Sequence, residues 1–368
     1  MVPFLRPNLV TSEKLIPYLE RIDHTRLYSN FGPINNHFES LVLEGYFKGV
    51  GALTTVNNAT TGLMLAISQA KRPSGRYALM PSFTFAATPL AAKWCGLEPY
   101  FVDIDPEKWC MDTAMVSSLV EQLGDDLAVV VPYATFGSCI DLEFYVALHE
   151  QSIPVVVDAA PCFGSVGAAG NFGDGFPGLV VYSFHATKSF GIGEGGMVYS
   201  ADIELIEALR QASNFGFSSN RTSTVLGLNA KMSEYSAAVA LATLECFPDK
   251  VKIRQKIHDS YVELLTQAGL LAGGWSLQSL DGSVAHQFFP ILCDEKDRNR
   301  EVVERLSRRG IEARTYFAPA CHHHGQFNSC PRTTMVVTER IEGRILSLPL
   351  WEEMTDRDIN LVVRGLVE

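Results

Sequence analysis

Features that mark exported, membrane and nucleic-acid-binding proteins are missing from this sequence of 368 residues. The amino-terminal region has neither a basic segment followed by an apolar run nor a stretch apolar enough to span a bilayer. No block of basic residues is present to neutralise a phosphate backbone, and the net charge is −11. The eight cysteines form no CxxC pair, which fits a reducing compartment. We therefore expect a soluble, cytoplasmic protein with no membrane or nucleic-acid partner.

The length and the 47% hydrophobic content predict more than one hydrophobic core. From about residue 50 to 200, short apolar runs alternate with longer helical stretches, which is typical of an α/β layer fold. The runs show no alternation of polar and apolar residues, so we expect strands that are buried on both faces. They are YALMP (77–81), PYFVDI (99–104), AVVVPY (128–133), PVVVDAA (154–160), LVVYSF (179–184) and GGMVYS (195–200).

The pattern changes after about residue 233, where helical periodicity runs through SEYSAAVALATLECFPDKVKIRQKIHDSYVELLTQAG. A long, partly exposed helix is predicted there, near a domain junction. We predict a large domain of residues 1–245 and a smaller C-terminal α/β domain of residues 246–368. Two further helices of the smaller domain are expected in EVVERLSRRG and TDRDINLVVRGL.

Lys188 follows an apolar run and precedes the glycine-rich segment GIGEGG. Glycines allow tight turning and close approach of the backbone to a ligand. Burial beneath apolar residues would lower the pKa of this lysine and leave a neutral amine available as nucleophile or base. A surface lysine beside a turn is the alternative, and for an isolated lysine it would be the better interpretation.

Asp158 ends the apolar run PVVVD, where a carboxylate is costly to bury without a cationic partner. The protonated ring nitrogen of pyridoxal 5'-phosphate (PLP) is such a partner. A structural cap is the alternative for Asp158 alone. Its pairing with Lys188, at the ends of two successive predicted strands, favours a PLP site.

The segment VNNATTG (56–62) comes directly before a helical pattern, LMLAISQAKR. Small residues at a helix start leave backbone N–H groups free to hold a phosphate, which the helix dipole also favours. An ordinary helix cap with no ligand is the commoner origin of such a segment.

Together these segments resemble the DegT/DnrJ/EryC1/StrS family of nucleotide-sugar aminotransferases, a branch of the fold-type I PLP-dependent transferases. The resemblance covers nearly the whole chain, and the lysine segment followed by GEGG is its most specific part. It implies a large domain with a mixed, mostly parallel sheet flanked by helices, and a smaller C-terminal α/β domain. The matching segments are VNNATTGL, PSFTFAAT (81–88), YFVDIDP (100–106), VVDAA (156–160), SFHATKSFGIGEGGM (183–197), GLNAKMSEYSAAVAL (227–241) and LSLPLWEEMTD (346–356).

The resemblance implies that Lys188 forms a Schiff base with PLP and later shuttles protons, and that Asp158 pairs with the pyridine nitrogen. It also implies that Phe85 stacks on the pyridine ring, where a flat apolar face gains contact area. From the sequence alone, a core aromatic residue at a helix start is an equally good interpretation of Phe85.

For the cofactor phosphate, the resemblance implies contacts from the backbone of Ala59 and Thr60 and from the Thr60 hydroxyl, with a further contact from Ser183. In this family, the residue that corresponds to Asn229 reaches across a dimer interface to the neighbouring cofactor's phosphate. The resemblance therefore implies a homodimer whose two sites are shared between subunits.

Two positions depart from the family pattern. Pro161 stands where the family has a glutamine that hydrogen-bonds the cofactor's ring oxygen, and proline has no side-chain donor. Lys231 stands where the family has an arginine; it is the candidate for anchoring a substrate, and it keeps the charge but loses the bidentate geometry.

The run Cys321-His322-His323-His324 raises the question of a metal site. Adjacent side chains on a strand point to opposite faces, so they would not converge on one ion, and no metal is expected. The family instead places a histidine here in a loop near the sugar-binding cleft. His322 or His323 is the candidate for that contact.

The implied reaction moves an amino group from L-glutamate, which becomes 2-oxoglutarate, to a nucleotide-linked keto sugar. Among keto sugars, the substrate that the resemblance favours is dTDP-4-keto-6-deoxyglucose, which would give an amino-deoxy sugar for surface polysaccharide (O-antigen or lipopolysaccharide) or glycoside biosynthesis.

Three alternative functions fit the sequence less well. A PLP-dependent sugar dehydratase would carry histidine in place of Lys188, a non-catalytic PLP-binding regulatory protein would need neither Lys188 nor Asp158, and a nicotinamide-dependent enzyme would show a GxGxxG turn.

Overall fold

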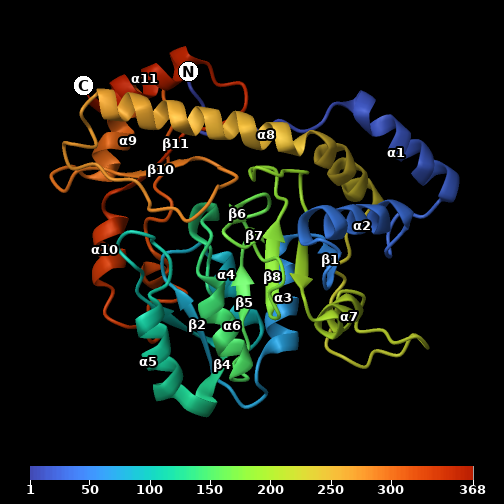
Figure 1. Ribbon diagram of the computed structural model, residues 1–368. Coiled ribbons are helices and arrows are strands. Elements are labelled where there is room, and N and C mark those ends of the chain that lie inside the picture. Colours follow the sequence, from blue (N-terminus) through green and yellow to red (C-terminus); the bar gives the residue numbers. More distant parts are fainter. Residues whose placement is uncertain (368) are drawn as a thin grey trace.

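A mixed β-sheet lies at the centre of the computed structural model, which describes residues 1–367 (Figure 1). Its two parts, with strand orders β3-β2-β4 and β5-β8-β9-β1, are joined by parallel bridges from Val130 to Val155 and from Tyr133 to Asp158. β9 runs antiparallel to both of its neighbours, while the other paired strands are parallel. The sheet is therefore mixed and mostly parallel, as the family resemblance implies.

The strands of this sheet are β1 Ala52–Val56, β2 Tyr77–Pro81, β3 Glu98–Val102, β4 Leu127–Val130, β5 Val156–Asp158, β8 Leu179–Ser183 and β9 Gly196–Ser200. Two antiparallel pairs lie outside it, β6 Val166–Gly167 with β7 Gly170–Asn171 and β10 Phe289–Leu292 with β11 Ile345–Leu348. All six predicted strand segments are confirmed. β1 was missed because Thr54 and Thr55 interrupt its apolar character, although both are fully buried.

The helices are α1 Ser12–Thr25, α2 Pro33–Phe47, α3 Ala59–Ala70, α4 Ala87–Trp94, α5 Thr113–Leu123, α6 Leu142–Glu150, α7 Ile203–Ala212, α8 Glu234–Gln267, α9 Asn299–Arg308, α10 Val336–Glu342 and α11 Asp356–Val367. Three short 3-10 turns, η1 Gly124–Asp126, η2 Thr135–Gly137 and η3 Cys321–His323, complete the described elements. The long helix predicted after residue 233 is confirmed as α8, and the two shorter predictions correspond to α9 and α11.

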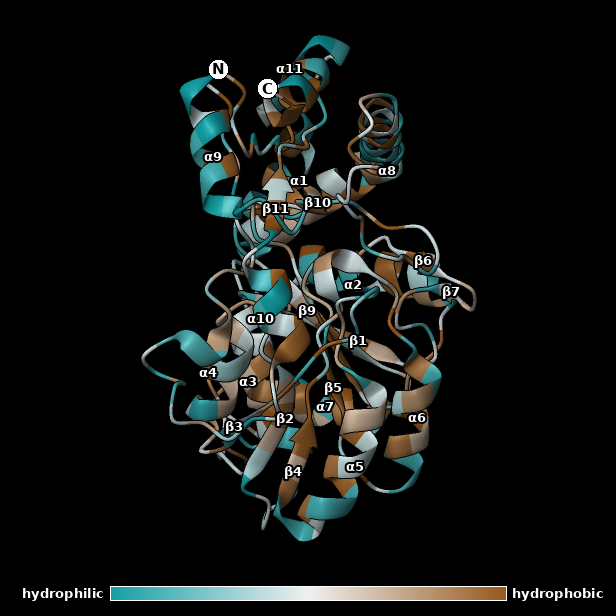
Figure 2. Ribbon diagram, turned by 90° about the vertical axis from the view of Figure 1, so that its left-hand side faces the viewer, coloured by the Kyte–Doolittle hydropathy of each residue, from teal (hydrophilic) through white to brown (hydrophobic). Residues whose placement is uncertain are grey.

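Side chains of β8 alternate between the two faces of the sheet. Val180 and Tyr182 pack into one core with residues of α2, α5, α6 and the start of α8. Val181 points into a second core with residues of α3, α4 and α7. Because both faces are covered, continuous apolar runs form the strands. Figure 2 shows the result as hydrophobic strands, β2 and β4 among them, inside helices with hydrophilic outer faces.

Helix α8 passes from this sheet to a separate C-terminal core. Phe247 still packs in the core of α2 and β8, whereas Ile257 and Tyr261 pack with β10, β11, α9 and α11. Val2 pairs with Ile311 and lies in the same C-terminal core, so both ends of the chain meet there (Figure 1). The domain boundary predicted after residue 245 falls inside α8 and stays a prediction.

Candidate active site

The candidate residues gather at one edge of the sheet. β1, β2, β5 and β8 run parallel to one another within the sheet, so their carboxyl ends meet at the edge where ligands bind in α/β folds. Asp158 is the last residue of β5, and Ser183 is the last residue of β8. The start of α3 follows β1, and the segment that contains Phe85 follows β2.

Lys188 lies in the turn after β8, where its N–H bonds to the His185 carbonyl at 2.8 Å. Its Nζ donates to the side-chain oxygen of Gln287 at 3.2 Å. Burial lowers the pKa of Lys188, while the nearby charge of Asp158 partly opposes this shift. The neutral, unprotonated amine is therefore more populated than for a lysine at the protein surface, as expected for a nucleophilic lysine.

Asp158 is buried, with 2% of its surface exposed. It accepts hydrogen bonds from Thr88 Oγ1 at 2.6 Å and from the Ala160 N–H at 3.1 Å. Burial raises its pKa, and these hydrogen bonds together with the charge of Lys188 work in the opposite direction. Among residues 1–367, no ion pair within 4.0 Å compensates this carboxylate. A cationic ring nitrogen would fit that position.

Backbone N–H groups at the start of α3 form a candidate phosphate-binding site. Asn58 caps the helix by accepting from Thr61 N at 2.9 Å, which leaves the N–H groups of Ala59 and Thr60 unbonded within the described chain. Gly196 passes so close that an added Cβ would lie 3.0 Å from Ala59 N. Ser183 is the strand neighbour of Gly196. The three predicted phosphate contacts therefore lie together, and the helix dipole favours an anion there.

Phe85 presents an exposed ring at the same edge, with 59% of its surface accessible. It is therefore not the core residue that its sequence context allowed. Its neighbour Thr84 bonds to Thr88 at 3.0 Å, and Thr88 bonds to Asp158, so the segment that carries the ring is tied to the buried acid. The ring centre of Phe317 lies 6.4 Å away. The amine, acid, aromatic face and N–H cradle together fit PLP.

Asn229 and Lys231 lie on a separate, exposed loop. Lys231 Nζ donates to Asn229 Oδ1 at 2.8 Å and lies 4.8 Å from the ring centre of Phe215. The Asn57 N–H donates to the Ala230 carbonyl at 2.7 Å, which places this loop beside the residues that precede α3. Among the described residues, no hydrogen bond or ion pair joins Asn229 or Lys231 to Lys188 or Asp158.

The histidine run does not lie on a strand, so the strand geometry that argued against a metal does not apply to it. Residues 321–323 form the 3-10 turn η3, in which the rings of His322 and His323 lie with centres 3.9 Å apart. The side chain of His322 is fully buried, whereas that of His323 is 45% exposed. Of these two candidates for a sugar contact, His323 is therefore the one whose ring is accessible.

Gln287 is a residue at this site that the sequence did not single out. Its side-chain oxygen accepts from Lys188 Nζ, and its amide nitrogen donates to Thr187 Oγ1 at 3.3 Å. Its backbone carbonyl is held by Arg254 at 3.1 Å, and Arg254 forms a buried ion pair with Glu352 at 2.9 Å. Because Gln287 is 99 residues from Lys188, no local pattern could have linked them.

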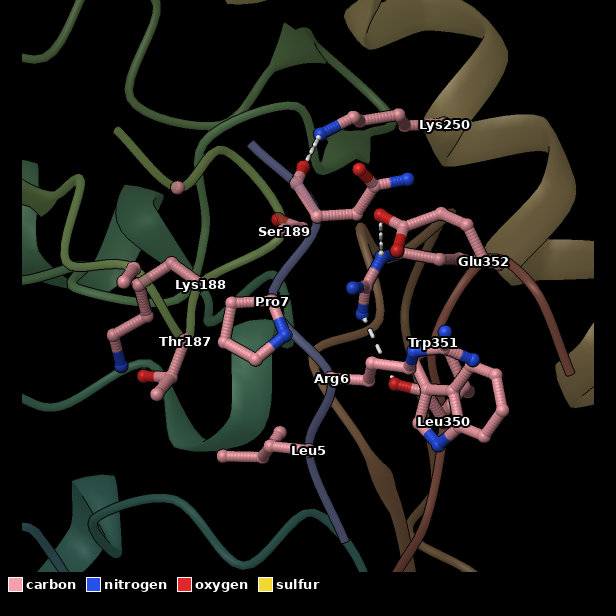
Figure 3. A pocket seen from close by; sticks show the side chains of 14 residues that line it. Leu5, Arg6, Pro7, Thr187, Lys188, Ser189, Lys250, Leu350, Trp351 and Glu352 are labelled. Carbon is pink, nitrogen blue, oxygen red and sulfur yellow. Dashed lines mark hydrogen bonds and ion pairs between the residues drawn. The ribbon is translucent and has the colours of Figure 1, made fainter. Parts of the chain in front are cut away.

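The amino-terminal segment closes one side of the Lys188 turn. Residues 5–8 line a pocket together with residues 186–189 and with Arg254 and residues 350–352 of the C-terminal part. In Figure 3, Pro7 lies between Thr187 and Lys188 on one side and Trp351 and Glu352 on the other. Lys250 holds this segment by donating to the Asn8 carbonyl at 2.6 Å. The Lys188 turn is thus packed against three distant parts of the chain.

The folded chain has the architecture of the fold-type I, PLP-dependent transferases. A Bacillus cereus protein assigned to the PLP-dependent aminotransferases superposes with a TM-score of 0.98 and 49% sequence identity, over 100% of both chains. The DegT/DnrJ/EryC1/StrS aminotransferase family matches residues 10–367, and the chain belongs to this family. It is a PLP-dependent aminotransferase of the nucleotide-sugar type.

Two further relatives are named for sugar chemistry. DesI, crystallised in the presence of its TDP-sugar product, superposes with a TM-score of 0.89 at 32% identity, covering 98% of this chain and 91% of DesI. The dTDP-4-amino-4,6-dideoxy-D-glucose transaminase of Shigella dysenteriae is 29% identical over 99% of this chain and 97% of its own length.

No helix among residues 1–367 is long and apolar enough to cross a membrane.

Proposed function

We propose that the protein transfers an amino group from L-glutamate to dTDP-4-keto-6-deoxyglucose, yielding 2-oxoglutarate and the 4-amino sugar nucleotide. The observation that carries this proposal is that the Lys188 amine and the buried Asp158 carboxyl lie near enough at the carboxyl edge of the sheet for each charge to influence the pKa of the other. The sugar is proposed from the likeness to DesI and to the Shigella dysenteriae transaminase. The product is proposed to feed surface polysaccharide or glycoside biosynthesis.

In this proposal Lys188 carries the cofactor covalently and, once released from it, moves a proton at Nζ. PLP supplies an electron sink for the bond changes at the amino-bearing carbon. The lowered pKa of Lys188 suits this role, because an amine that loses its proton readily can act as general base and then as general acid.

The other roles follow from position. Asp158 would hold a proton on the ring nitrogen, and the Phe85 ring would cover one face of the cofactor. The N–H groups of Ala59 and Thr60, with the hydroxyl groups of Thr60 and Ser183, would bind its phosphate. Each of these groups orients the cofactor, so the proton transfers remain with Lys188.

A panel of dTDP-, UDP- and GDP-linked keto sugars, each assayed with glutamate, tests the proposed substrate. We expect 2-oxoglutarate and an amino sugar in equal amounts, with the highest kcat/KM for dTDP-4-keto-6-deoxyglucose. A higher kcat/KM for a UDP- or GDP-linked 3-keto sugar would contradict the proposed substrate while leaving the aminotransferase assignment intact.

We further propose that the active form is a homodimer in which Asn229 and Lys231 serve the partner's site. The loop that carries them is bordered by exposed apolar side chains, whose accessible fractions are 81% for Leu226, 46% for Phe215 and 49% for Tyr235. Clustered apolar exposure of this kind favours a protein contact. A two-fold contact would create two equivalent shared sites.

Subunit mixing tests this sharing. Inactive Lys188→Ala and inactive Asn229→Ala chains, mixed under conditions of proven exchange, should regain up to about one quarter of wild-type activity, because half of the chains pair as mixed dimers and each has one intact site of two. The control mixes Lys188→Ala chains with Asp158→Asn chains, whose lesions lie in the same site. Exchange without recovery would mean that Asn229 serves only its own chain.

Gln287 is proposed as a positioning residue for Lys188. A hydrogen-bond acceptor at 3.2 Å favours the charged amine, so Gln287→Leu should lower the pKa of Lys188 further. The pH dependence of Lys188 acylation in the cofactor-free protein measures this directly. Gln267→Leu, at the exposed end of α8, is the matched control. An unchanged Lys188 pKa in Gln287→Leu would remove Gln287 from the site.

A further inference from the structure

Three side chains with ligating atoms meet between η3 and the end of α10. His322 and His323 belong to η3, and Glu342 is the last residue of α10. One ligand atom from each lies within 4.8 Å of the other two. The shortest separation joins His323 Nδ1 to Glu342 Oε2, at 3.0 Å. Apart from the sugar contact expected of one of the two histidines, the proposed reaction assigns no role to this group of atoms.

The ring of His322 has a buried nitrogen without a partner. Its Nδ1 is bonded to Ser82 Oγ at 2.6 Å, but its Nε2 has no hydrogen bond, although the side chain is fully buried. Glu339 Oε1 lies 3.6 Å from that Nε2, beyond hydrogen-bond distance. If Nδ1–H donates to Ser82, the lone pair of Nε2 is free. Metal-bound histidines are oriented by such a partner on the second ring nitrogen.

The carboxylates come from a helix that is fixed at both ends. Asp103 accepts from the N–H groups of Val337 and Thr338 at 2.8 Å each, which anchors the first turn of α10. At the other end, Asn299 donates to the Glu342 carbonyl at 2.7 Å. Glu339 and Glu342 are three residues apart, so they share one side of the helix.

We propose that His322, His323 and Glu342 bind a divalent transition-metal ion, with zinc as the best match and Glu339 in the fourth position. Imidazole and carboxylate groups are ligands that zinc accepts, at bond lengths of about 2.0–2.2 Å. Tetrahedral bonds of that length place ligand atoms about 3.3–3.6 Å apart. The separations of 3.0 and 3.6 Å between paired ligand atoms are close to this range.

The geometry of η3 removes the argument against a metal that the sequence suggested. On a strand the adjacent histidine rings would diverge, whereas the 3-10 turn brings them onto one side. The ion would join η3 to α10. The segment before η3 carries Phe317, whose ring lies 5.6 Å from that of Phe83 and 6.4 Å from that of Phe85. The metal would thus brace the wall beside the cofactor site, without taking part in the reaction.

Calorimetric titration with ZnCl₂ tests the site. The PLP-loaded full-length protein is first stripped of metal with a chelator and exchanged into chelator-free buffer. We expect one ion per chain, with affinity at least about 10-fold weaker in His323→Ala and in Glu342→Gln, since losing a ligand costs no less than losing a partner that orients one. Both positions are partly exposed, so these variants spare the buried ring of His322. Circular dichroism verifies that each variant is folded.

His324→Ala is the matched control, because this adjacent histidine is partly exposed and its Nε2 bonds to the Pro319 carbonyl, outside the cluster. Its zinc affinity should equal that of the wild type. Three results would overturn the proposal: no binding at one ion per chain, equal affinity in the wild type and both ligand variants, or an equal loss in His324→Ala. The second result would place the ion elsewhere, for example on the free cysteines.

Discussion

Replacing Lys188 with alanine is expected to abolish amino transfer, with kcat lowered by at least about 10⁴-fold. The loss should be this large because the same amine would hold the cofactor and move the proton, and among residues 1–367 no other lysine forms an ion pair or hydrogen bond with Asp158 or Gln287. The measurement is 2-oxoglutarate formation with saturating glutamate and keto sugar. PLP should still bind non-covalently through the N–H groups at the start of α3.

Lys250→Ala is the control for that variant. Lys250 lines the same pocket but donates to the Asn8 carbonyl, and its charge has no proposed part in the reaction. The kcat of the Lys250→Ala enzyme should stay within a few-fold of wild type. Appreciable turnover by Lys188→Ala, in enzyme purified from a host that cannot supply wild-type protein, would contradict the proposed role.

Asp158→Asn is expected to lower kcat by about 10²- to 10³-fold, the scale seen when one preorganised electrostatic contact is removed. The side-chain oxygen of asparagine can accept the bond from the Ala160 N–H, while its amide nitrogen would face Thr88 Oγ1 as a donor. Asparagine cannot carry the negative charge that holds a proton on the ring nitrogen. The rate should therefore fall much more than cofactor occupancy. Steady-state kinetics and the absorbance of bound PLP measure the two quantities separately.

Asp158→Asn should not lower the stability of the cofactor-free protein, although it lowers kcat. Burial raises the pKa of Asp158, so folding disfavours its charged form, and that penalty is present above the folded-state pKa and disappears as the pH falls below the unfolded-state value. A neutral asparagine has no such penalty, so the Tm of cofactor-free Asp158→Asn at pH 7 should equal or exceed that of the wild type. A lower Tm with unchanged kcat would show a structural acid instead.

The parts of the site that the sequence predicts are those set by the sheet. Asp158 and Ser183 end buried strands, and the carboxyl ends of parallel strands meet at one edge. Continuous apolar runs were sufficient to locate those strands, because both faces of the sheet are covered. β1 was not predicted because it contains the polar residue Thr55. This residue can be buried because Glu39 accepts hydrogen bonds from the Thr55 N–H at 2.8 Å and from the Thr55 hydroxyl at 2.9 Å.

The parts that the sequence does not predict depend on tertiary contacts. Gln287 reaches Lys188 because Arg254 and Glu352 fix the segment before β10 against α8. The ring directions of His322 and His323 depend on a 3-10 turn, whose period differs from that of a strand. A single residue's neighbours along the chain carry no signal for either arrangement.

Borohydride reduction of the PLP-loaded protein, followed by proteolysis and mass spectrometry, tests the central claim most directly. Reduction makes the bond between cofactor and lysine permanent, so the modified residue can be identified in its peptide. We predict a single pyridoxyl group on Lys188, within the sequence SFHATKSFGIGEGG. A pyridoxyl group on another lysine, or none on Lys188 in protein that is catalytically active, would contradict the account.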